Sequence, residues 1–150
     1  MTDVVPPQVR SRMMAAVKCK NTKPEMVIRS GLHALGFRYK LHDSRLPGKP
    51  DLVLPKYRGV ILVNGCFWHM HECQLFKLPS TRKEFWREKL ERNRQRDLRN
   101  IDRLLASGWR VMVVWECALK GPRRGAKDTI LGECVHWLLS DVEFASLEGR

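Results

Sequence analysis

The segment 64–73 concentrates the side chains best suited to bind a transition metal. Four candidate ligands lie close together in it: Cys66, His69, His71 and Cys73. Closed structural zinc sites take tetrahedral ligands, mostly thiolates and imidazoles. Cys66, His71 and Cys73 can supply three of these from one tight loop, which predicts a zinc site in preference to a set of buried thiols.

The fourth zinc ligand has two candidates. Cys117 follows the apolar run 111–115, which is typical of a buried strand whose end can approach the loop. His69 is the alternative ligand, but an imidazole can also serve as a general base because it titrates near neutral pH. From the residues alone, both roles of His69 stay open.

A second candidate metal site centres on Asp51, which directly precedes an apolar run. An aspartate at the start of a strand is most often a solvated side chain without a functional role, but its carboxylate is also a ligand that Mg²⁺ prefers. Many nucleases place a second acid and a lysine on the next strand, whereas this chain offers there only backbone carbonyls and the Asn64 amide. His69 can take the place of the lysine. Glu25 fits a helix capping box, and it can also hydrogen-bond a metal-bound water.

The overall charge points to a polyanionic partner. The 150 residues carry a formal net charge of +12 and a sequence pI of about 10.0, so nucleic acid is the first candidate. The apolar runs are too short to span a membrane, and residues 1–7 lack the apolar core of a signal peptide. We therefore expect a cytoplasmic protein without a membrane partner.

The length fits one domain with a sizeable hydrophobic core. Residues 1–20 form a basic arm that we assign to the same domain as residues 21–150, with a short helix expected over 11–17. The five cysteines are odd in number and irregularly spaced, which favours metal ligands or plain thiols over disulfides. Cys19 and Cys134 are interpreted as plain thiols.

The elements that must position these residues can be read from periodicity and from turn residues. Capping boxes at residues 22–25 and 81–84 should each begin a helix, and glycines 36 and 108 should end them. The expected elements are a helix to residue 35, strands 37–41, 51–54 and 60–63, a helix 81–107, a strand 109–115 and a helix 128–139. This α-β-β-β-α-β-α order predicts an α/β fold with a mixed central sheet, a hairpin of the second and third strands, and helices on both faces.

The long helix is the most basic element of the chain. Its residues 82–103 include nine Lys or Arg and five Asp or Glu. Aromatic residues near its start, Phe67, Trp68 and Trp86, are candidate wedges, since apolar side chains among basic ones can part stacked base pairs. Phe85 is expected in the core.

Several of these motifs together resemble the very short patch repair endonucleases. The match extends over residues 8–139 and rests on Pro50-Asp51, the run Gly65-Cys66-Phe67-Trp68-His69, Thr81-Arg82 with Phe85-Trp86, and Gly108-Trp109 through Trp115-Glu116-Cys117. The resemblance implies a restriction-endonuclease-like mixed sheet, an α-β-β-β-α-β core with flanking helices and a structural zinc site. It also implies that 21–150 is a single endonuclease domain.

The resemblance also implies a role for each matched residue. The family is a DNA repair endonuclease that recognises T:G mismatches left by deaminated 5-methylcytosine and nicks 5′ to the mismatched thymine. The implied catalytic positions are Asp51, His69, Glu25 and Asn64, with Mg²⁺ held by Asp51 and the Val63 carbonyl. The implied Zn²⁺ ligands are Cys66, His71, Cys73 and Cys117, and the implied DNA contacts are Met14, Phe67, Trp68, Trp86, Lys89 and Asn93.

Two positions depart from the family's best-known form, which has Thr and His where this chain has Val63 and Asn64. Val63 should suffice if only its carbonyl is used, whereas Asn64 removes an imidazole and puts rate and metal preference in question. Two other functions remain as alternatives: a restriction-type DNA nuclease with another recognition sequence, and a non-catalytic zinc-dependent nucleic-acid-binding module. The expected partners of the monomer are mismatched double-stranded DNA and downstream mismatch-repair proteins, at the nucleoid of a prokaryote.

Overall fold

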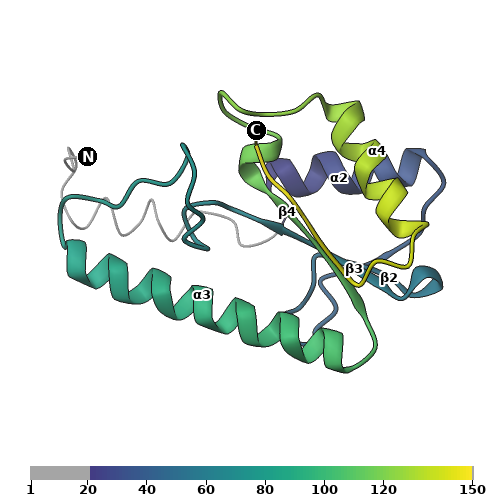
Figure 1. Cartoon of the computed structure of the whole chain (residues 1–150), viewed down its shortest axis with the longest axis horizontal. Coiled ribbons are helices and arrows are strands. Elements are labelled where there is room, and N and C mark those ends of the chain that lie inside the picture. The colour runs from purple at the N-terminus through teal and green to yellow at the C-terminus, as the bar shows by residue number, and fades with distance from the viewer. Residues whose placement is uncertain (1–20, 150) are drawn as a thin grey trace.

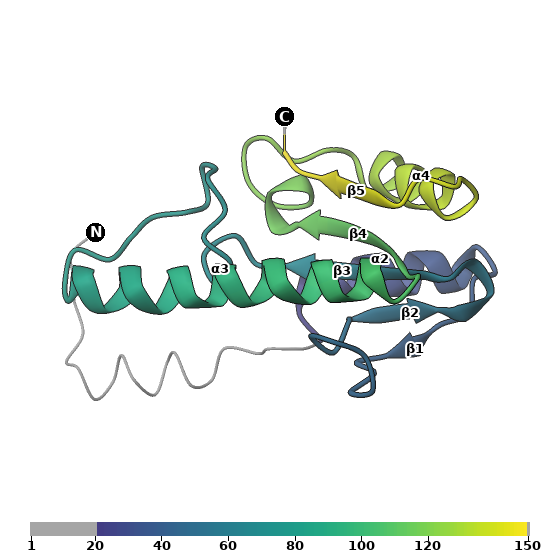
Figure 2. The ribbon, with the colours of Figure 1, turned by 60° about the horizontal axis from the view of Figure 1, so that its bottom comes forward.

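The centre of the molecule is a five-stranded mixed sheet in the order β1-β2-β3-β4-β5 (Figure 2). The computed structural model describes residues 21–149. The strands are β1 (Lys40–Leu41), β2 (Leu52–Leu54), β3 (Gly59–Asn64), β4 (Arg110–Trp115) and β5 (Phe144–Leu147). The first three strands pair antiparallel, and β4 and β5 then add in parallel to β3 and to β4. The expected hairpin of the second and third strands is thereby confirmed.

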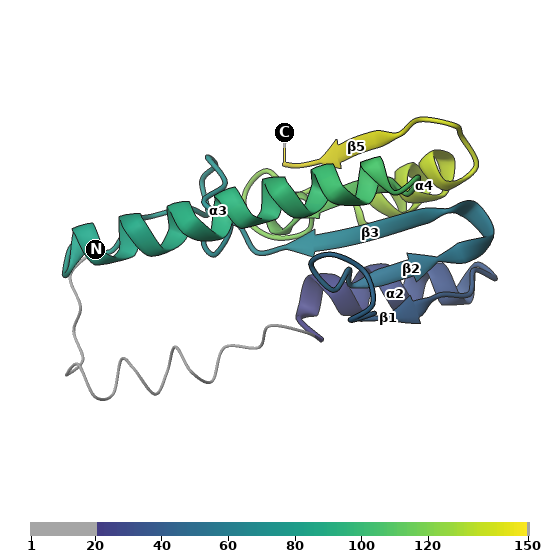
Figure 3. The same cartoon turned by 90° about the horizontal axis from the view of Figure 1, so that it is seen from below.

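Among residues 21–149, three helices cover the two faces of the sheet. They are α2 (Lys23–Ala34), α3 (Lys83–Ala106) and α4 (Lys127–Leu138), and short 3₁₀ turns lie at Pro55–Tyr57 and Glu116–Ala118. Figures 1 and 3 show α2 and α4 on one face and α3 on the other, with the first half of α3 extending past the sheet. The predicted mixed sheet with helices on both faces is confirmed.

Each face of the sheet packs against its own core, because successive side chains of a strand point in opposite directions. Leu52, Leu54 and Ile61 face α2 and α4 in the larger core. Val53 and Val60 point the other way and meet Leu104 of α3 in the smaller core. Apolar side chains thus alternate between the two faces along β2 and β3, and each face offers apolar surface to the helices that cover it.

The two expected capping boxes have different outcomes. At α2, the Thr22 hydroxyl accepts a hydrogen bond from the Glu25 N–H at 3.4 Å, as predicted. The expected box at Thr81 does not form: α3 follows Arg82, which has a left-handed backbone with φ of 56° and makes no side-chain cap. The Arg82 guanidinium instead lies 4.3 Å from the centre of the Phe85 ring.

Two strands differ from expectation. Of the residues 37–41, only Lys40 and Leu41 pair in the sheet, because Phe37 packs into the larger core and the Tyr39 hydroxyl donates to the Arg29 carbonyl at 2.7 Å. β5 was not predicted. It is a short edge strand whose exposed and half-buried residues alternate, with Phe144 exposed, so its sequence lacks a strong apolar signal.

The sheet topology brings many chain segments to one end. The parallel register pairs Asn64 of β3 with Trp115 of β4, so both strands end together, and Val114 pairs with Leu147 near the end of β5. β2 runs the opposite way and therefore starts at this end, directly after Asp51. All the residues described next lie at or beside this end of the sheet.

Residues 1–20 lie outside the described part of the chain, and with them the expected short helix over 11–17, Met14 and Cys19. Within residues 21–149, no helix has both the length and the apolar character that crossing a membrane requires.

Candidate metal centre and active-site cleft

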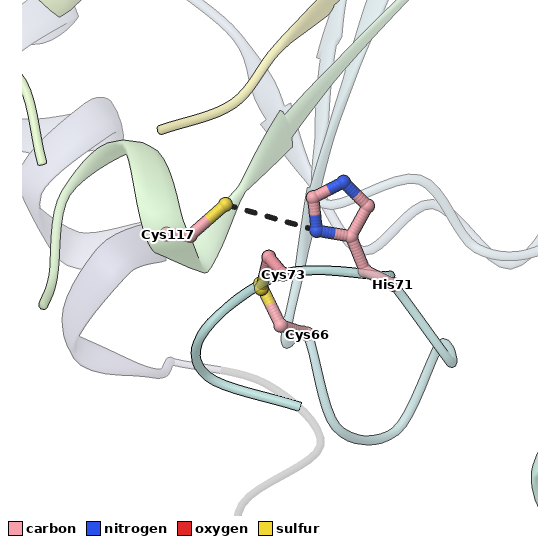
Figure 4. A group of neighbouring side chains, drawn as sticks. All are labelled: Cys66, His71, Cys73 and Cys117. Carbon is pink, nitrogen blue, oxygen red and sulfur yellow. Dashed lines mark hydrogen bonds between the residues drawn. The ribbon is translucent and has the colours of Figure 1, made fainter. Parts of the chain in front are cut away.

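Four metal-ligating side chains meet beyond the ends of β3 and β4 (Figure 4). We call Cys66, His71, Cys73 and Cys117 the thiol cluster, and their ligand atoms all lie within 4.8 Å of one another. The Cys117 Sγ is 3.7 Å from the His71 Nδ1. Three cysteines and one histidine are a common ligand set of closed structural zinc sites, so the arrangement fits that metal.

The local backbone explains how the loop and the second strand end meet. The His71 N–H donates to the Cys66 carbonyl at 2.9 Å and closes the loop between the first two ligands. Glu116 joins the loop to the end of β4, since its Oε1 accepts a hydrogen bond from the Cys66 N–H at 3.2 Å. The loop is therefore held to the same strand end that carries Cys117.

The thiol cluster has two buried and two half-buried residues, and it has its own supporting contacts. Cys66 and Cys117 are buried, and burial raises the pKa of both thiols above the ordinary value. The Gly149 N–H donates to the Cys117 Sγ at 3.3 Å. Without a cation, such thiols stay protonated, whereas a bound metal would hold them as thiolates.

His71 is fixed on two further sides. Its ring stacks on Trp115 with the centroids 4.0 Å apart and the planes 9° apart. Its Nε2 lies 2.7 Å from the Glu148 carboxylate, which leaves Nδ1 toward the sulfurs. A carboxylate on the outer nitrogen of a metal-binding histidine fixes the tautomer and the ring orientation.

A second cluster lies where α2 meets the start of β2. We call Glu25, His42 and Asp51 the carboxylate cluster, and their ligand atoms also lie within 4.8 Å of one another. The Asp51 Oδ2 accepts a hydrogen bond from the Val63 N–H at 2.7 Å. The Glu25 Oε2 lies 2.9 Å from the His42 Nε2 and 3.0 Å from the Arg29 Nη1.

The electrostatics of Asp51 are those of a carboxylate that lacks a counter-charge. Burial is the main cause that raises its pKa to about 7, and the charge of Glu25 adds to it, while the Val63 N–H and His69 act in the opposite direction. A divalent cation between the two carboxylates would remove this penalty. The cluster therefore fits a metal of the hard, oxygen-preferring type.

A cleft of about 1390 Å³ opens beside the carboxylate cluster. Its walls include eight of the residues that the sequence singled out: Asp51, Val63, Asn64, Phe67, Trp68, His69, Lys89 and Asn93. None of the four thiol-cluster residues lines it. One end of the sheet thus carries a closed site and an open one.

His69 lies in the wall of the cleft, apart from the thiol cluster. Its Nδ1 contacts the Asp97 carboxylate of α3 at hydrogen-bond distance, which leaves Nε2 as the second ring nitrogen. In the described part of the chain, the group of possible metal ligands near Cys66 contains Cys117 and excludes His69. This geometry suits a base in the cleft.

Aromatic rings gather between the loop and the first turns of α3. The Phe67 ring centre lies 5.0 Å from that of Trp68 and 5.8 Å from that of Trp86. Phe67 and Trp68 are half-buried, whereas Trp86 is only 9% exposed. Phe85, which was expected in the core, is 40% exposed; that expectation is wrong, because the first turns of α3 extend beyond the sheet.

The two polar positions on α3 are tied to these rings. The Lys89 Nζ lies 5.6 Å from the centre of the Trp86 ring, and the Asn93 Nδ2 donates to the Trp68 carbonyl at 3.3 Å. Both residues also line the cleft. A cation, an amide and aromatic surface side by side are suited to contact a nucleic acid.

Sequence reasoning missed three contributors to these sites: His42, Asp97 and Glu148. A signal existed for His42, because β1 pairs with β2 and brings its following residue next to Asp51, with the His42 N–H donating to the Asp51 carbonyl at 3.2 Å. Asp97 and Glu148 lie far in sequence from their histidine partners. No local pattern marks them.

Comparison with known proteins adds a family to this geometry. Residues 2–75 match the family model described as DNA mismatch endonuclease Vsr. The DNA mismatch endonuclease Vsr of Escherichia coli (strain K12) is 41% identical over 148 residues, which cover 99% of this chain and 95% of that protein. The type II nicking enzyme V.XorIIP of Xanthomonas oryzae pv. oryzae is 50% identical over 119 residues, 79% of this chain and 88% of that protein. The type II nicking enzyme V.NmeAIP of Neisseria meningitidis is 44% identical over 120 residues, 80% of this chain and 86% of that protein.

Proposed function

This chain belongs to the DNA mismatch endonuclease Vsr family, and we propose from that premise that it nicks one strand of duplex DNA 5′ to the thymine of a T:G mismatch. Membership makes it a homologue of a mismatch endonuclease, a DNA hydrolase of DNA repair. The single observation that carries the finer proposal is the cleft, whose walls combine Asp51, His69 and the aromatic pair Phe67 and Trp68. The proposed catalytic residues and the proposed contacts to the mismatch thus line the same cleft.

The catalytic metal we propose is Mg²⁺, held by the Asp51 carboxylate and the Val63 carbonyl. Its support is the pair of carboxylates Glu25 and Asp51, since burial and, to a lesser extent, the charge of Glu25 raise the pKa of Asp51. When bound, Mg²⁺ would polarise the scissile phosphate and stabilise developing negative charge. The Val63 N–H holds the Asp51 carboxylate in place from the neighbouring strand.

His69 is the proposed general base. Its Nε2 would accept a proton from the attacking water, and the Asp97 carboxylate on Nδ1 would orient the ring and stabilise its protonated form. Asn64 ends β3, is mostly buried and lines the cleft, where its amide can hydrogen-bond water or phosphate oxygen. Glu25 would hydrogen-bond water on the metal, consistent with its place beside Asp51.

Zinc is the metal that we propose for the thiol cluster. Support comes from the ligand set, the burial of Cys66 and Cys117, and the Glu148 carboxylate on the outer nitrogen of His71. Zinc here would take no part in the chemistry. It would fix the loop that carries Phe67, Trp68 and His69, because its ligands lie on both sides of these residues.

Substrate binding follows from the basic helix and the aromatic rings. We propose that Phe67, Trp68 and Trp86 insert beside the mismatch, with Lys89 and Asn93 near the mismatched bases. Met14, the proposed minor-groove contact, lies outside the described residues. The exposed arginines of α3, such as Arg92 and Arg96, supply positive charge for phosphate contacts.

The finer fold and setting are also proposals. The element order from α2 to β4 supports a restriction-endonuclease-like α-β-β-β-α-β core. We propose one endonuclease domain over 21–150 with residues 1–20 as its arm. It would act as a monomer in the cytoplasm, on the nucleoid DNA of a prokaryote, with mismatch-repair proteins acting downstream.

One other function has a specific observation in its favour. Two of the similar proteins are named type II nicking enzymes, so a nicking enzyme with another recognition context shares this core. A nucleic-acid-binding module without catalysis would not need the arrangement of Asp51, Glu25 and His69 beside the cleft.

A nicking assay tests the proposal. Zinc-loaded protein is mixed in Mg²⁺ with a duplex that carries one T:G mismatch in a cytosine-methylation context, and with the same duplex carrying T:A. We expect a nick 5′ to the mismatched thymine only, and none with Asp51→Asn. Equal cutting of both duplexes would support the alternative nicking enzyme, and binding without cutting would overturn the catalytic proposal.

A further inference from the structure

His42 is a residue to which the mechanism above gives no task. It directly follows β1 and has a left-handed backbone with φ of 46°. The His42 N–H donates to the Asp51 carbonyl at 3.2 Å, so the two residues are fixed side by side. Its ring is 19% exposed and its Nε2 lies 2.9 Å from the Glu25 carboxylate.

The position of this imidazole completes a set of three ligands. One ligand atom from each of Glu25, His42 and Asp51 lies within 4.8 Å of the other two, which is the spacing that a single small cation can bridge. His42 and Asp51 line the cleft, so the set is open to solvent on one side. Glu25 is 1% exposed and approaches from beneath.

The charges around the set also suit a divalent cation. Glu25 and Asp51 carry two negative charges when ionised, and the Arg29 guanidinium offsets part of this at 3.0 Å from Glu25. Lys49, Lys89, Arg96 and Lys120 also line the cleft. None of these four has an ion pair with Glu25 or Asp51 among the described residues, so a metal can supply the counter-charge next to Asp51.

Nitrogen in the ligand set changes which metal is preferred. Carboxylate and carbonyl oxygens suit Mg²⁺ and Mn²⁺ alike, whereas imidazole favours first-row transition ions and is a poor ligand for Mg²⁺. Among the described residues that line the cleft, His42 and His69 are the histidines, and Asp97 contacts one nitrogen of His69. His42 is the imidazole that shares a ligand group with the two carboxylates.

We propose that His42 is a third protein ligand of the catalytic cation and makes this site prefer a transition ion such as Mn²⁺ over Mg²⁺. The inference rests on the proposed metal at Asp51. His42 would thus supply an imidazole to a site that has an amide, Asn64, where the family's best-known form has a histidine. His42 would turn its Nε2 from Glu25 to the cation, beside Asp51 and the Val63 carbonyl, and Glu25 would hydrogen-bond a water on that cation.

Direct metal binding tests this ligand role without an activity assay. The full chain, with zinc already loaded, is titrated with Mn²⁺ and separately with Mg²⁺ by calorimetry. His42→Gln keeps a hydrogen-bond donor to Glu25 but removes the nitrogen ligand. We expect its Mn²⁺ affinity to fall about tenfold or more, as losses around a metal site commonly do, and its Mg²⁺ affinity to change much less.

Two controls make the result decisive. His136→Gln removes an exposed imidazole of α4 and should leave both affinities unchanged. Pulsed electron paramagnetic resonance of Mn²⁺ on the wild-type chain should show coupling to an imidazole nitrogen, which needs no variant to fold. An equal loss of both ions in His42→Gln, or no nitrogen coupling, would overturn the ligand role.

The same titration distinguishes failure of the His42 ligand role from failure of the proposed metal site at Asp51. Asp51→Asn should weaken both ions strongly. If it does so while His42→Gln changes nothing, the metal at Asp51 stands and the role of His42 fails. If Asp51→Asn binds both ions as the wild type does, the proposed catalytic site is wrong, and the inference fails with it.

Discussion

The thiol cluster and the carboxylate cluster lie at the same end of one sheet, but they differ in their access to water. Cys66 and Cys117 are buried, the Gly149 N–H donates to the Cys117 Sγ, and the Glu116 carboxylate accepts from the Cys66 N–H. Asp51 and His42 face a cleft of about 1390 Å³. Metal sites of proteins divide in this way: structural sites are closed by protein ligands, and catalytic sites keep a position open.

The comparison teaches that one sheet edge can serve both purposes because different strands supply the ligands. The ends of β3, β4 and β5 support the thiol cluster, whereas the end of β1 and the start of β2 support the carboxylate cluster. β3 is common to both, since Val63 holds Asp51 and Cys66 follows two residues after Asn64. Substitutions should therefore separate stability from catalysis.

The largest expected effect is loss of the closed site. Cys117→Ser should abolish zinc binding, and with it the nicking activity. Structural zinc contributes on the order of 10 kcal/mol in zinc-dependent peptides, so we expect the melting temperature to fall by more than about 10 °C. Metal analysis and thermal melting check this. Cys134→Ala, which changes a buried thiol outside the cluster, should keep its zinc; equal zinc content in both variants would refute the ligand role.

Asp51→Asn should separate the two clusters most clearly. We expect nicking to fall by about a thousandfold or more, because several kcal/mol of charge stabilisation are lost. Zinc content should not change.

Asp51→Asn should lower the nicking rate but raise the stability of the metal-free protein. Since the pKa of Asp51 is raised from 3.8 to about 7, its folded form is favoured when protonated, and this contribution is lost as pH rises from about 4 through about 7. Without Mg²⁺, Asp51→Asn should therefore melt at a higher temperature than the wild type at pH 8, with a smaller difference at pH 5. A lower melting temperature at pH 8 would contradict the penalty that burial and the charge of Glu25 place on ionised Asp51.

A smaller effect is expected where the open site is supported from α3. Asp97→Asn removes the negative charge beside His69 but keeps the size of the side chain. We expect single-turnover nicking to fall by about 10- to 100-fold and the pH dependence of the rate to shift, with zinc content and melting temperature unchanged. An unaltered pH profile would mean that Asp97 does not position the base.

The smallest effect should come from the outer support of the closed site. Glu148→Gln weakens the contact to the His71 Nε2, and the Glu148 side chain is 59% exposed, so water can replace part of it. Zinc dissociation, followed with a chromogenic chelator, should be faster by less than about tenfold. Nicking at saturating zinc should stay at the wild-type rate, and a large loss would show that the two clusters are not separable.

The fold was predictable wherever a buried element has a run of apolar residues or apolar residues at regular spacing. β2, β3 and β4 are buried apolar runs, α2 has a capping residue at its start and a glycine after its end, and α4 has apolar residues at helical spacing, so these elements lie close to the expected ranges. β5 lies at an exposed edge and has no such run. Thr81 illustrates the limit of local motifs: it has the residues of a capping box, but the chain enters α3 through Arg82 in a left-handed turn.

The sites show a similar division. Cys66, His71 and Cys73 could be grouped from sequence because one loop contains them, and Cys117 because a strand leads to it. Asp97 could not, because its partner His69 comes from another element, and His42 could be found only through the pairing of β1 with β2. The contacts of His42 depend on strand pairing, and those of Asp97 depend on where α3 crosses the cleft. The spacing of residues along the chain predicts neither.

The parallel pairing of β3 with β4 has a consequence for how the protein matures. During synthesis, Cys66, His71 and Cys73 emerge long before Cys117, with all of α3 between them. A parallel partner strand can be added only after such a crossover has closed, and distant contacts stabilise the chain only once that entropy is lost. The nascent loop therefore offers an incomplete ligand set, and binding of the proposed zinc ion would occur late, only in a chain whose sheet is correctly assembled.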